Sequence, residues 1–269
     1  MPGQVQTLND EQMTLLSSRL QDRYEPNFAW GNVGSFYSIL PALRAFWPCG
    51  PQIVTAQSLL IADTANNFHL TAAHSPLFGY ESLIQYVDFD GVNDYATYAD
   101  NAQFDILATE AYNVYPGLTM GCWIYPDRAV GTNEHLLSKF GAAFKSYALV
   151  RLAAGNAVFV IYDAAAAGVS ATSTSLVRQS YWQFVCGRFV PATSIDAYLS
   201  TGIGTLEKTS TATALNNIRN TAVNFTMAST ADPLLFFDGK ISLAFISASA
   251  LSDTMINALY QLSRPLFGQ

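Results

Sequence analysis

Charged side chains are scarce in this chain of 269 residues. Asp, Glu, Lys and Arg together make up 12% of it, about half of the roughly 25% that is usual for globular domains. The formal net charge is −7 and the few basic residues do not cluster, which argues against a nucleic-acid-binding surface. No apolar run reaches the roughly 18 residues that a membrane span requires. We therefore expect no nucleic-acid partner, no membrane span, and a surface of Ser, Thr, Asn, Ala and Tyr that suits permanent contacts with other subunits.

Cysteine is also rare. The chain has three, at wide spacing: Cys49, Cys122 and Cys186. Two of them fall in apolar, strand-like runs, beside Trp123 and Val185 respectively. An odd number of widely spaced cysteines favours buried free thiols over disulfides or a metal site.

Recognisable catalytic and zinc motifs are missing. His69, His74 and His135 have no Cys or second His at zinc spacing, so we interpret His69 and His135 as hydrogen-bonded structural residues. No Gly-x-Ser-x-Gly motif supports a serine nucleophile, although a triad assembled from distant residues stays open. Residues 1–6 lack the positive end and apolar block of a secretory signal. We expect a soluble protein made in the cytoplasm.

Apolar residues, in contrast, are abundant at 50%, with 17 Phe and 14 Tyr. From Leu43 onward, apolar and polar residues alternate with period two between turn residues, which is the pattern of short β-strands. We expect strands at 45–48, 68–71, 85–89, 118–125, 136–139, 147–152, 158–162, 182–189, 195–199, 225–228 and 240–247, with a hairpin across 191–194. Asp90-Gly91 and Asp238-Gly239 each predict a tight turn between antiparallel strands, because Gly tolerates positive φ.

Helical patterns occur near the two ends. Ser252 caps a segment in which Met255, Ile256, Leu259 and Tyr260 share one side, and Pro265 follows it. Many short strands and a single terminal helix predict an all-β domain at residues 39–269, an antiparallel jelly-roll β-sandwich with a C-terminal helix.

Residues 1–38 differ from this domain and predict an N-terminal arm with a short helix. Asn9 or Asp10 can cap the helix, and an irregular segment follows it. Either the segment folds back on its own domain, or it is an arm that docks on a neighbouring subunit; the sequence does not decide. The residues that would make the contact are Met13, Leu16, Leu20, Phe28, Trp30, Phe36 and Tyr37.

The stretches from about Leu43 to Phe267 stand in the order of a known family. Residues 86–95 are similar to an "F-D-G-x-x-D-Y" hairpin, and residues 118–126 resemble a central "W-x-x-P" strand. Residues 181–185 and 195–199 look like paired sheet strands, and residues 237–241 and 250–253 like a closing strand and helix. The chain thus resembles the laminin-G-like/concanavalin A-like lectin superfamily in its pentraxin-type jelly-roll form. The resemblance implies that Trp47, Trp123 and Trp182 are core residues.

The same resemblance raises two possible properties, calcium binding and sugar hydrolysis. Calcium is the usual ion of the superfamily, held by loop oxygens, and the candidate ligands are Asp63, Asn66, Asp90 and Asp238, with Asn67, Asp88 and Asp94 beside them. We favour the alternative that these side chains make turns through bonds to their own backbone, any calcium being structural. Related glucanases use a Glu-x-Asp-x-x-Glu pattern, which none of the six glutamates begins.

These observations lead to a functional hypothesis. Because functions are grafted onto this fold, we rely on the arm, the free thiols, the weak charge and the absent secretory signal, which look most like structural proteins of tailed phages and related viruses. We expect a non-enzymatic virion structural protein, decorating a capsid or attached to a head or tail. Its partners would be other virion proteins, further copies of itself, and host surface glycans. The alternative is a carbohydrate-binding or adhesion module of a cellular protein.

Overall fold

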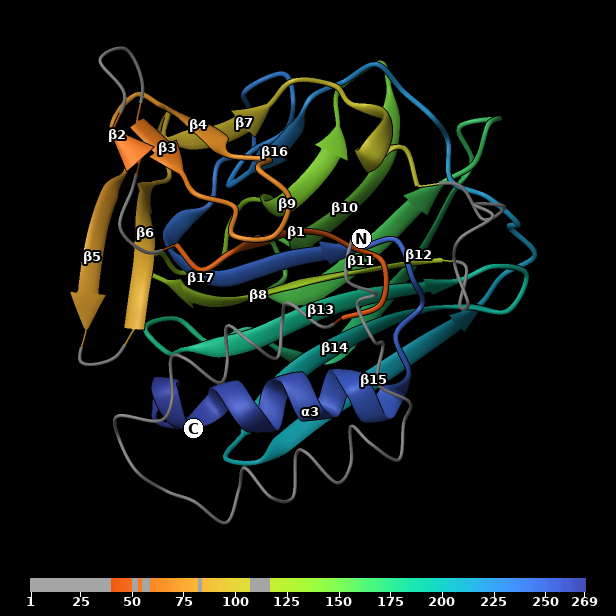
Figure 1. Cartoon of the computed structure of the whole chain (residues 1–269). Coiled ribbons are helices and arrows are strands. Elements are labelled where there is room, and N and C mark those ends of the chain that lie inside the picture. Colours follow the sequence, from red (N-terminus) through yellow and green to blue (C-terminus); the bar gives the residue numbers. More distant parts are fainter. Residues whose placement is uncertain (1–39, 50–52, 55–58, 82–83, 107–116) are drawn as a thin grey trace, which may run out of the picture.

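The structure is a computed structural model (Figure 1). It describes residues 40–49, 53–54, 59–81, 84–106 and 117–269. The predicted arm, with Met13, Leu16, Leu20, Phe28, Trp30, Phe36 and Tyr37, lies outside the described residues. The domain boundary at residue 38 therefore stays a prediction.

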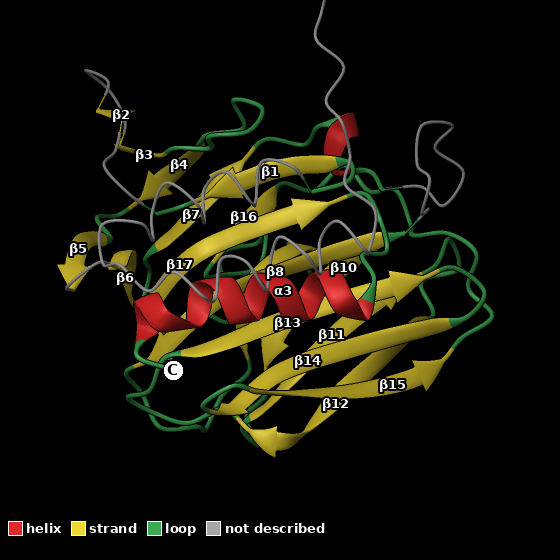
Figure 2. Cartoon of the chain, turned by 60° about the horizontal axis from the view of Figure 1, so that its bottom comes forward, coloured by secondary structure: helices red, strands yellow, loops and turns green. Residues whose placement is uncertain are grey.

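Two antiparallel sheets form a sandwich (Figures 1 and 2). One is eight-stranded, and seven of its strands follow the order β15-β14-β13-β8-β17-β6-β5. Strand β6 pairs with residues 238–241 of β17, and the eighth strand, β1, pairs with residues 244–247 of β17. Its strands are β1 (Leu43–Trp47), β5 (Leu77–Glu81), β6 (Ile84–Asp90), β8 (Leu118–Pro126), β13 (Gln183–Val190), β14 (Ser194–Gly202), β15 (Thr205–Ala212) and β17 (Asp238–Ser247).

The second sheet is nine-stranded, in the order β12-β11-β10-β9-β16-β7-β4-β3-β2. Its strands are β2 (Ile53–Val54), β3 (Leu59–Ile61), β4 (Leu70–Ala73), β7 (Tyr95–Tyr98), β9 (Glu134–Phe140), β10 (Lys145–Arg151), β11 (Asn156–Tyr162), β12 (Gly168–Leu176) and β16 (Phe225–Met227). Short 3-10 helices η2 (Ala102–Phe104) and η3 (Arg264–Phe267) lie in the connections and at the C-terminus.

The main core fills the space between the sheets. Alternate residues of each strand point into it, as period-two alternation requires. Trp47 stacks on Phe225 at a centroid distance of 5.3 Å, and Phe104 stacks on Phe225 at 4.9 Å. Cys49 and Cys122 belong to this core, and all three cysteines are buried and free. The predicted free thiols are confirmed.

A second apolar cluster lies on the outer face of the eight-stranded sheet, under helix α3 (Asp253–Ser263). The helix begins as predicted, because the Ser252 side chain accepts a hydrogen bond from the Met255 N–H. Trp123 stacks on Phe267 at 4.1 Å and donates to Ser263 Oγ at 2.9 Å. This cluster fixes the C-terminal segment on the sheet.

The helix is too short to cross a membrane, and no helix among the described residues is long and apolar enough to do so.

The predicted all-β sandwich with its C-terminal helix is confirmed, and so are the three core tryptophans. The prediction that the two Asp-Gly pairs form hairpin turns is wrong, although Asp90 does accept turn hydrogen bonds from the backbone that follows it. Asp90 ends β6 and Gly91 begins a crossing to β7 in the other sheet, so residues 86–95 are not a hairpin. Asp238 and Gly239 begin β17 and pair with Asp90 and Phe89. Gly239 is needed for close approach, because a Cβ there would overlap the Tyr125 carbonyl oxygen.

Candidate functional surface

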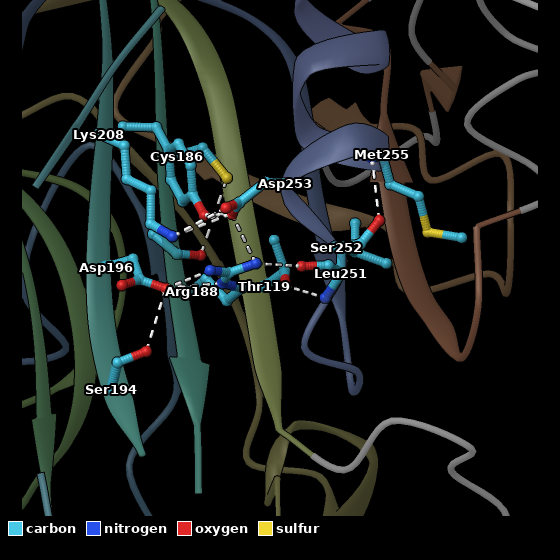
Figure 3. A network of polar contacts seen from close by, with 12 residues as sticks. Thr119, Cys186, Arg188, Ser194, Asp196, Lys208, Leu251, Ser252, Asp253 and Met255 are labelled. Carbon is cyan, nitrogen blue, oxygen red and sulfur yellow. Dashed lines mark hydrogen bonds and ion pairs between the residues drawn. The ribbon is translucent and has the colours of Figure 1, made fainter. Parts of the chain in front are cut away.

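Helix α3 covers only part of the outer face of the eight-stranded sheet, and a polar network fixes its N-terminus there (Figure 3). Arg188 on β13 pairs with Asp196 on β14, with Nη2 2.6 Å from Oδ2. Arg188 Nη1 lies 2.8 Å from Asp253 Oδ1 at the helix start. The Arg188 side chain also donates to the Leu251 carbonyl oxygen at 2.8 Å. A largely buried arginine thus joins two strands to the helix.

Tyr198 and Lys208 complete this network. The Tyr198 hydroxyl donates to Asp253 Oδ1 at 2.6 Å, and Lys208 Nζ lies 2.9 Å from Asp253 Oδ2. Partial burial raises the pKa of the Asp253 carboxyl, but its bonds to Tyr198 and Lys208 and the charge of Arg188 outweigh burial and lower it. Asp253 therefore carries a charge at the helix N-terminus, where the helix dipole favours an anion. Strands β13, β14 and β15 therefore hold the N-terminus of helix α3 on the sheet.

The remaining part of the same face carries a tyrosine–lysine patch, which we define as Tyr86, Asp88, Tyr125 and Lys240. Lys240 on β17 lies directly opposite Asp88 on β6 and Tyr125 on β8, and residues opposite one another share a face. Lys240 Nζ lies 5.0 Å from the Tyr86 ring centroid and 4.6 Å from that of Tyr125. All four side chains are partly exposed. Two aromatic rings, an ammonium and a carboxylate therefore meet at the surface.

Other aromatic rings pack against the two tyrosines of the patch. Trp182 lies 6.1 Å from Tyr86 and 5.6 Å from Tyr125 between centroids, and 4.9 Å from Phe267 at the end of the helix. On the other side, the Tyr86 ring covers Gly79 of β5, where a Cβ would overlap the ring. The positions of both tyrosine rings are thus set by packing, and both side chains remain partly exposed.

Acidic groups adjoin the patch. Burial, followed by the charge of Asp127, raises the pKa of Asp88 despite the nearby Lys240 ammonium. Burial also raises the pKa of Asp238, although Arg128 opposes the shift. The local field is negative, and Lys240 is the cation within the patch. Such a surface offers hydrogen bonds to a neutral polar ligand and repels an anion.

The predicted calcium ligands fall in two separate places. Asp63 lies in the loop before β4, where Oδ1 accepts from the N–H groups of Phe46 and Ala65 and Oδ2 from those of Asn66 and Phe68, at 2.8–3.0 Å. The Asn66 side-chain amide donates to the carbonyl oxygens of residues 43 and 44. The turn-making interpretation is confirmed for Asp63, whereas the Asn66 side chain bonds to a distant strand instead of its own loop.

Asp90 and Asp238 face each other across β6 and β17. Asp90 Oδ1 accepts from the N–H groups of Val92, Asn93 and Asp94 at 2.8–3.1 Å. Partial burial raises the pKa of Asp90, but these three bonds outweigh it and the net shift is downward. Asp238 Oδ2 lies 3.8 Å from Arg128 Nε. Within the described ranges, no group of three or more His, Cys, Asp or Glu residues is arranged to hold a metal. Calcium binding stays a prediction.

Glu134 is the most buried glutamate among the described residues and is held by two arginines. Its Oε2 lies 2.9 Å from Arg151 Nη1, and its Oε1 accepts from Arg128 Nε at 2.9 Å and Nη2 at 2.6 Å. Glu207, on β15, accepts from backbone N–H groups of β12. Both carboxylates thus have structural partners.

The prediction of hydrogen-bonded histidines holds for His69 but not for Nδ1 of His135. His69 Nδ1 accepts from the Asp63 N–H at 3.0 Å, so His69 is hydrogen-bonded as predicted, one residue before β4. His135 on β9 is 4% exposed and its Nδ1 has no hydrogen-bond partner among the described residues. Its ring packs at 4.9 Å from Phe140. Apolar packing, rather than hydrogen bonding of Nδ1, holds this ring.

The amino-acid sequence did not predict the tyrosine–lysine patch. Period-two alternation places Tyr86 and Asp88 on one face of a strand, and that signal was present. The neighbours of this strand could not be inferred, because β17 lies some 150 residues further along the chain.

A two-sheet jelly roll with one helix on a sheet face is a lectin-like architecture, and comparisons agree. The family model of the concanavalin A-like lectin/glucanases superfamily matches residues 90–257. The chain belongs to this superfamily. No curated protein matches it.

Several solved structures share the fold at low identity. The binding domain of Paraclostridial Mosquitocidal Protein 1 superposes with a TM-score of 0.61 at 11% identity, covering 83% of this chain and 52% of that one. The binding domain of botulinum neurotoxin DC in complex with SialylT gives 0.55 at 13%, covering 83% and 52%. The ligand-binding domain of botulinum neurotoxin serotype D in complex with N-acetylneuraminic acid gives 0.53 at 13%, covering 85% and 52%. The chain thus spans about half the length of these structures.

Proposed function

We propose that the chain is a non-enzymatic recognition module that binds neutral sugars through its tyrosine–lysine patch. The carrying observation is that two partly exposed tyrosine rings, Tyr86 and Tyr125, meet Lys240 and share a sheet face with Asp88, beside the apolar cluster under helix α3. The C–H face of a pyranose can pack on the electron-rich face of an aromatic ring. Lys240 would donate to a sugar hydroxyl and Asp88 would accept from one.

The structural neighbours and the charge near the patch both bear on which sugar would bind. Two of the structural neighbours are named as complexes with SialylT and N-acetylneuraminic acid, which makes a sugar ligand a natural candidate for this fold. In this chain, however, the patch itself contains Asp88, and the charges of Asp127 and Asp238 act on it from nearby. That charge favours a neutral sugar over an acidic one.

A glycan array of neutral and sialylated sugars tests this function. We expect retention of neutral glycans, weakened about tenfold by Tyr86→Ala or Tyr125→Ala, which is the loss of roughly one stacking contact. Tyr162→Ala is the matched control, because Tyr162 carries Lys145 over its ring at 5.5 Å but lies on the nine-stranded sheet. An array with no retained glycan, or equal loss in the control, would count against the patch.

We further propose that the module is carried on a virion as a decoration or head- or tail-attached protein, anchored through residues 1–38. The weak charge of the chain and its free thiols support this. So do exposed apolar side chains such as Leu77 and Ile203, about 70% exposed, which suit contacts with further subunits. Mass spectrometry of purified particles should detect the chain, and deletion of residues 1–38 should abolish attachment. Particles that never contain it, or a deletion that leaves attachment intact, would refute this role and leave sugar binding to be judged separately.

A further inference from the structure

A lysine ammonium is enclosed among oxygen atoms at the edge of the main core. Lys139 on β9 has a side chain that is 0% exposed. Its Nζ lies 2.6 Å from Asp100 Oδ1 and 3.0 Å from Asp105 Oδ1. It also donates to the carbonyl oxygens of Thr221 and Val223. Four oxygen atoms thus compete for three N–H groups, and the functional patch uses none of these residues.

The two carboxylates differ in their surroundings. The Asp105 side chain is 12% exposed, whereas that of Asp100 is 36% exposed. Asp105 stands between Phe104 and Ile106, which are both buried in the core. Its Oδ1 makes no hydrogen bond of good geometry among the described residues, although the lysine nitrogen lies within 3.0 Å. Asp105 is therefore a poorly solvated carboxyl group held against an amine.

Such an arrangement favours condensation of the two groups. A buried ion pair bears a desolvation cost for both charges, and conversion to a neutral amide removes that cost. Fixing the amine beside the carboxyl group gives the reaction a high effective concentration. Restricting water at the site disfavours the reverse hydrolysis.

We propose that Lys139 and Asp105 form an intramolecular isopeptide bond, with Asp100 as the proton carrier. In the reaction, Lys139 Nζ loses a proton to Asp100 and attacks Asp105 Cγ. The new C–N bond forms, Nζ gives up a second proton, and Asp100 relays both protons to one carboxyl oxygen of Asp105, which leaves as water when its bond to Cγ breaks. An ammonium and a carboxylate thus yield one amide and one water, with no change in oxidation state. The link would tie β9 to the loop that follows β7.

The intact mass of the purified protein tests this inference directly. We expect a folded chain that is lighter than its sequence by one water. A digest with trypsin and chymotrypsin should then yield a peptide pair joined between Lys139 and Asp105. Water loss confined to a single peptide would indicate a cyclised aspartate instead and would overturn the proposal, as would an unchanged mass.

Variants assign the roles of the three residues. Lys139→Arg keeps the positive charge but should restore the full mass of its sequence, as should Asp105→Ala. Asp105→Asn should form the same amide by losing ammonia. Asp100→Asn should leave the amine and acceptor in place and slow the bond formation at least tenfold. Thermal unfolding of each variant verifies folding, and the wild-type mass decides the proposal even where a variant does not fold.

Discussion

Stability should fall between pH 7 and pH 5 because of His135. Burial lowers the pKa of this imidazole from 6.5 to about 4. In the unfolded chain the group takes up a proton near pH 6.5, whereas in the folded protein it resists protonation until about pH 4. The unfolded state therefore binds more protons in this window, so stability is lost as pH falls. The difference amounts to ~2 kcal/mol between pH 7 and pH 5, and about 3 kcal/mol once pH falls below 4.

Urea unfolding monitored by tryptophan fluorescence at pH 7 and pH 5 measures this loss. His135→Leu removes the titrating group and the unpaired Nδ1 at similar volume, so the variant should lose ~2 kcal/mol less than the wild type over the same interval. His74→Leu, at an exposed histidine, is the matched control for removing one imidazole. If wild type and His135→Leu lose equal stability, the pH dependence arises from other groups and the argument for His135 is wrong.

Three further changes follow from the contacts. Glu134→Gln leaves the buried Arg151 and the partly exposed Arg128 without their shared anion and should cost about 3–5 kcal/mol in urea unfolding, whereas the exposed Glu81→Gln should change it by less than about 0.5 kcal/mol. Gly239→Ala places a Cβ against the Tyr125 carbonyl at a φ of +136°, so it should cost about 3 kcal/mol, and a loss below about 1 kcal/mol would contradict the packing. Ser252→Ala removes the α3 N-cap and should lower the free energy of unfolding by ~1 kcal/mol, with Ser252→Asp retaining most of it.

Strands rich in apolar residues were predicted well from the sequence. The predicted strand at 118–125 became β8, and the hairpin at 182–199 became β13 and β14. These strands lie in the middle of the eight-stranded sheet, where one face packs against the main core and the other against the helix. Their sequences therefore carry the full hydrophobic signal.

Edge strands escaped prediction. β12 (GVSATSTSL) and β15 (TLEKTSTA) are built mainly of Ser, Thr and small residues. Each lies at the end of its sheet and pairs through its backbone with one neighbour only. Small polar side chains suffice there, so alternation of large apolar residues is absent. The Asp-Gly pairs misled for a related reason, since a glycine at positive φ serves both a turn and a close backbone approach.

Three basic side chains of this chain are enclosed in the fold. Lys139, Arg151 and Arg188 are buried or nearly so, and each joins a strand to another segment through carboxylates. The chain has only 13 Lys and Arg against 20 Asp and Glu, so its charge attracts an anionic ligand weakly over distance. Recognition at the tyrosine–lysine patch would then depend on ring contact and short hydrogen bonds. Because such contacts with a neutral sugar are hardly screened by salt, its affinity should stay nearly constant as ionic strength rises.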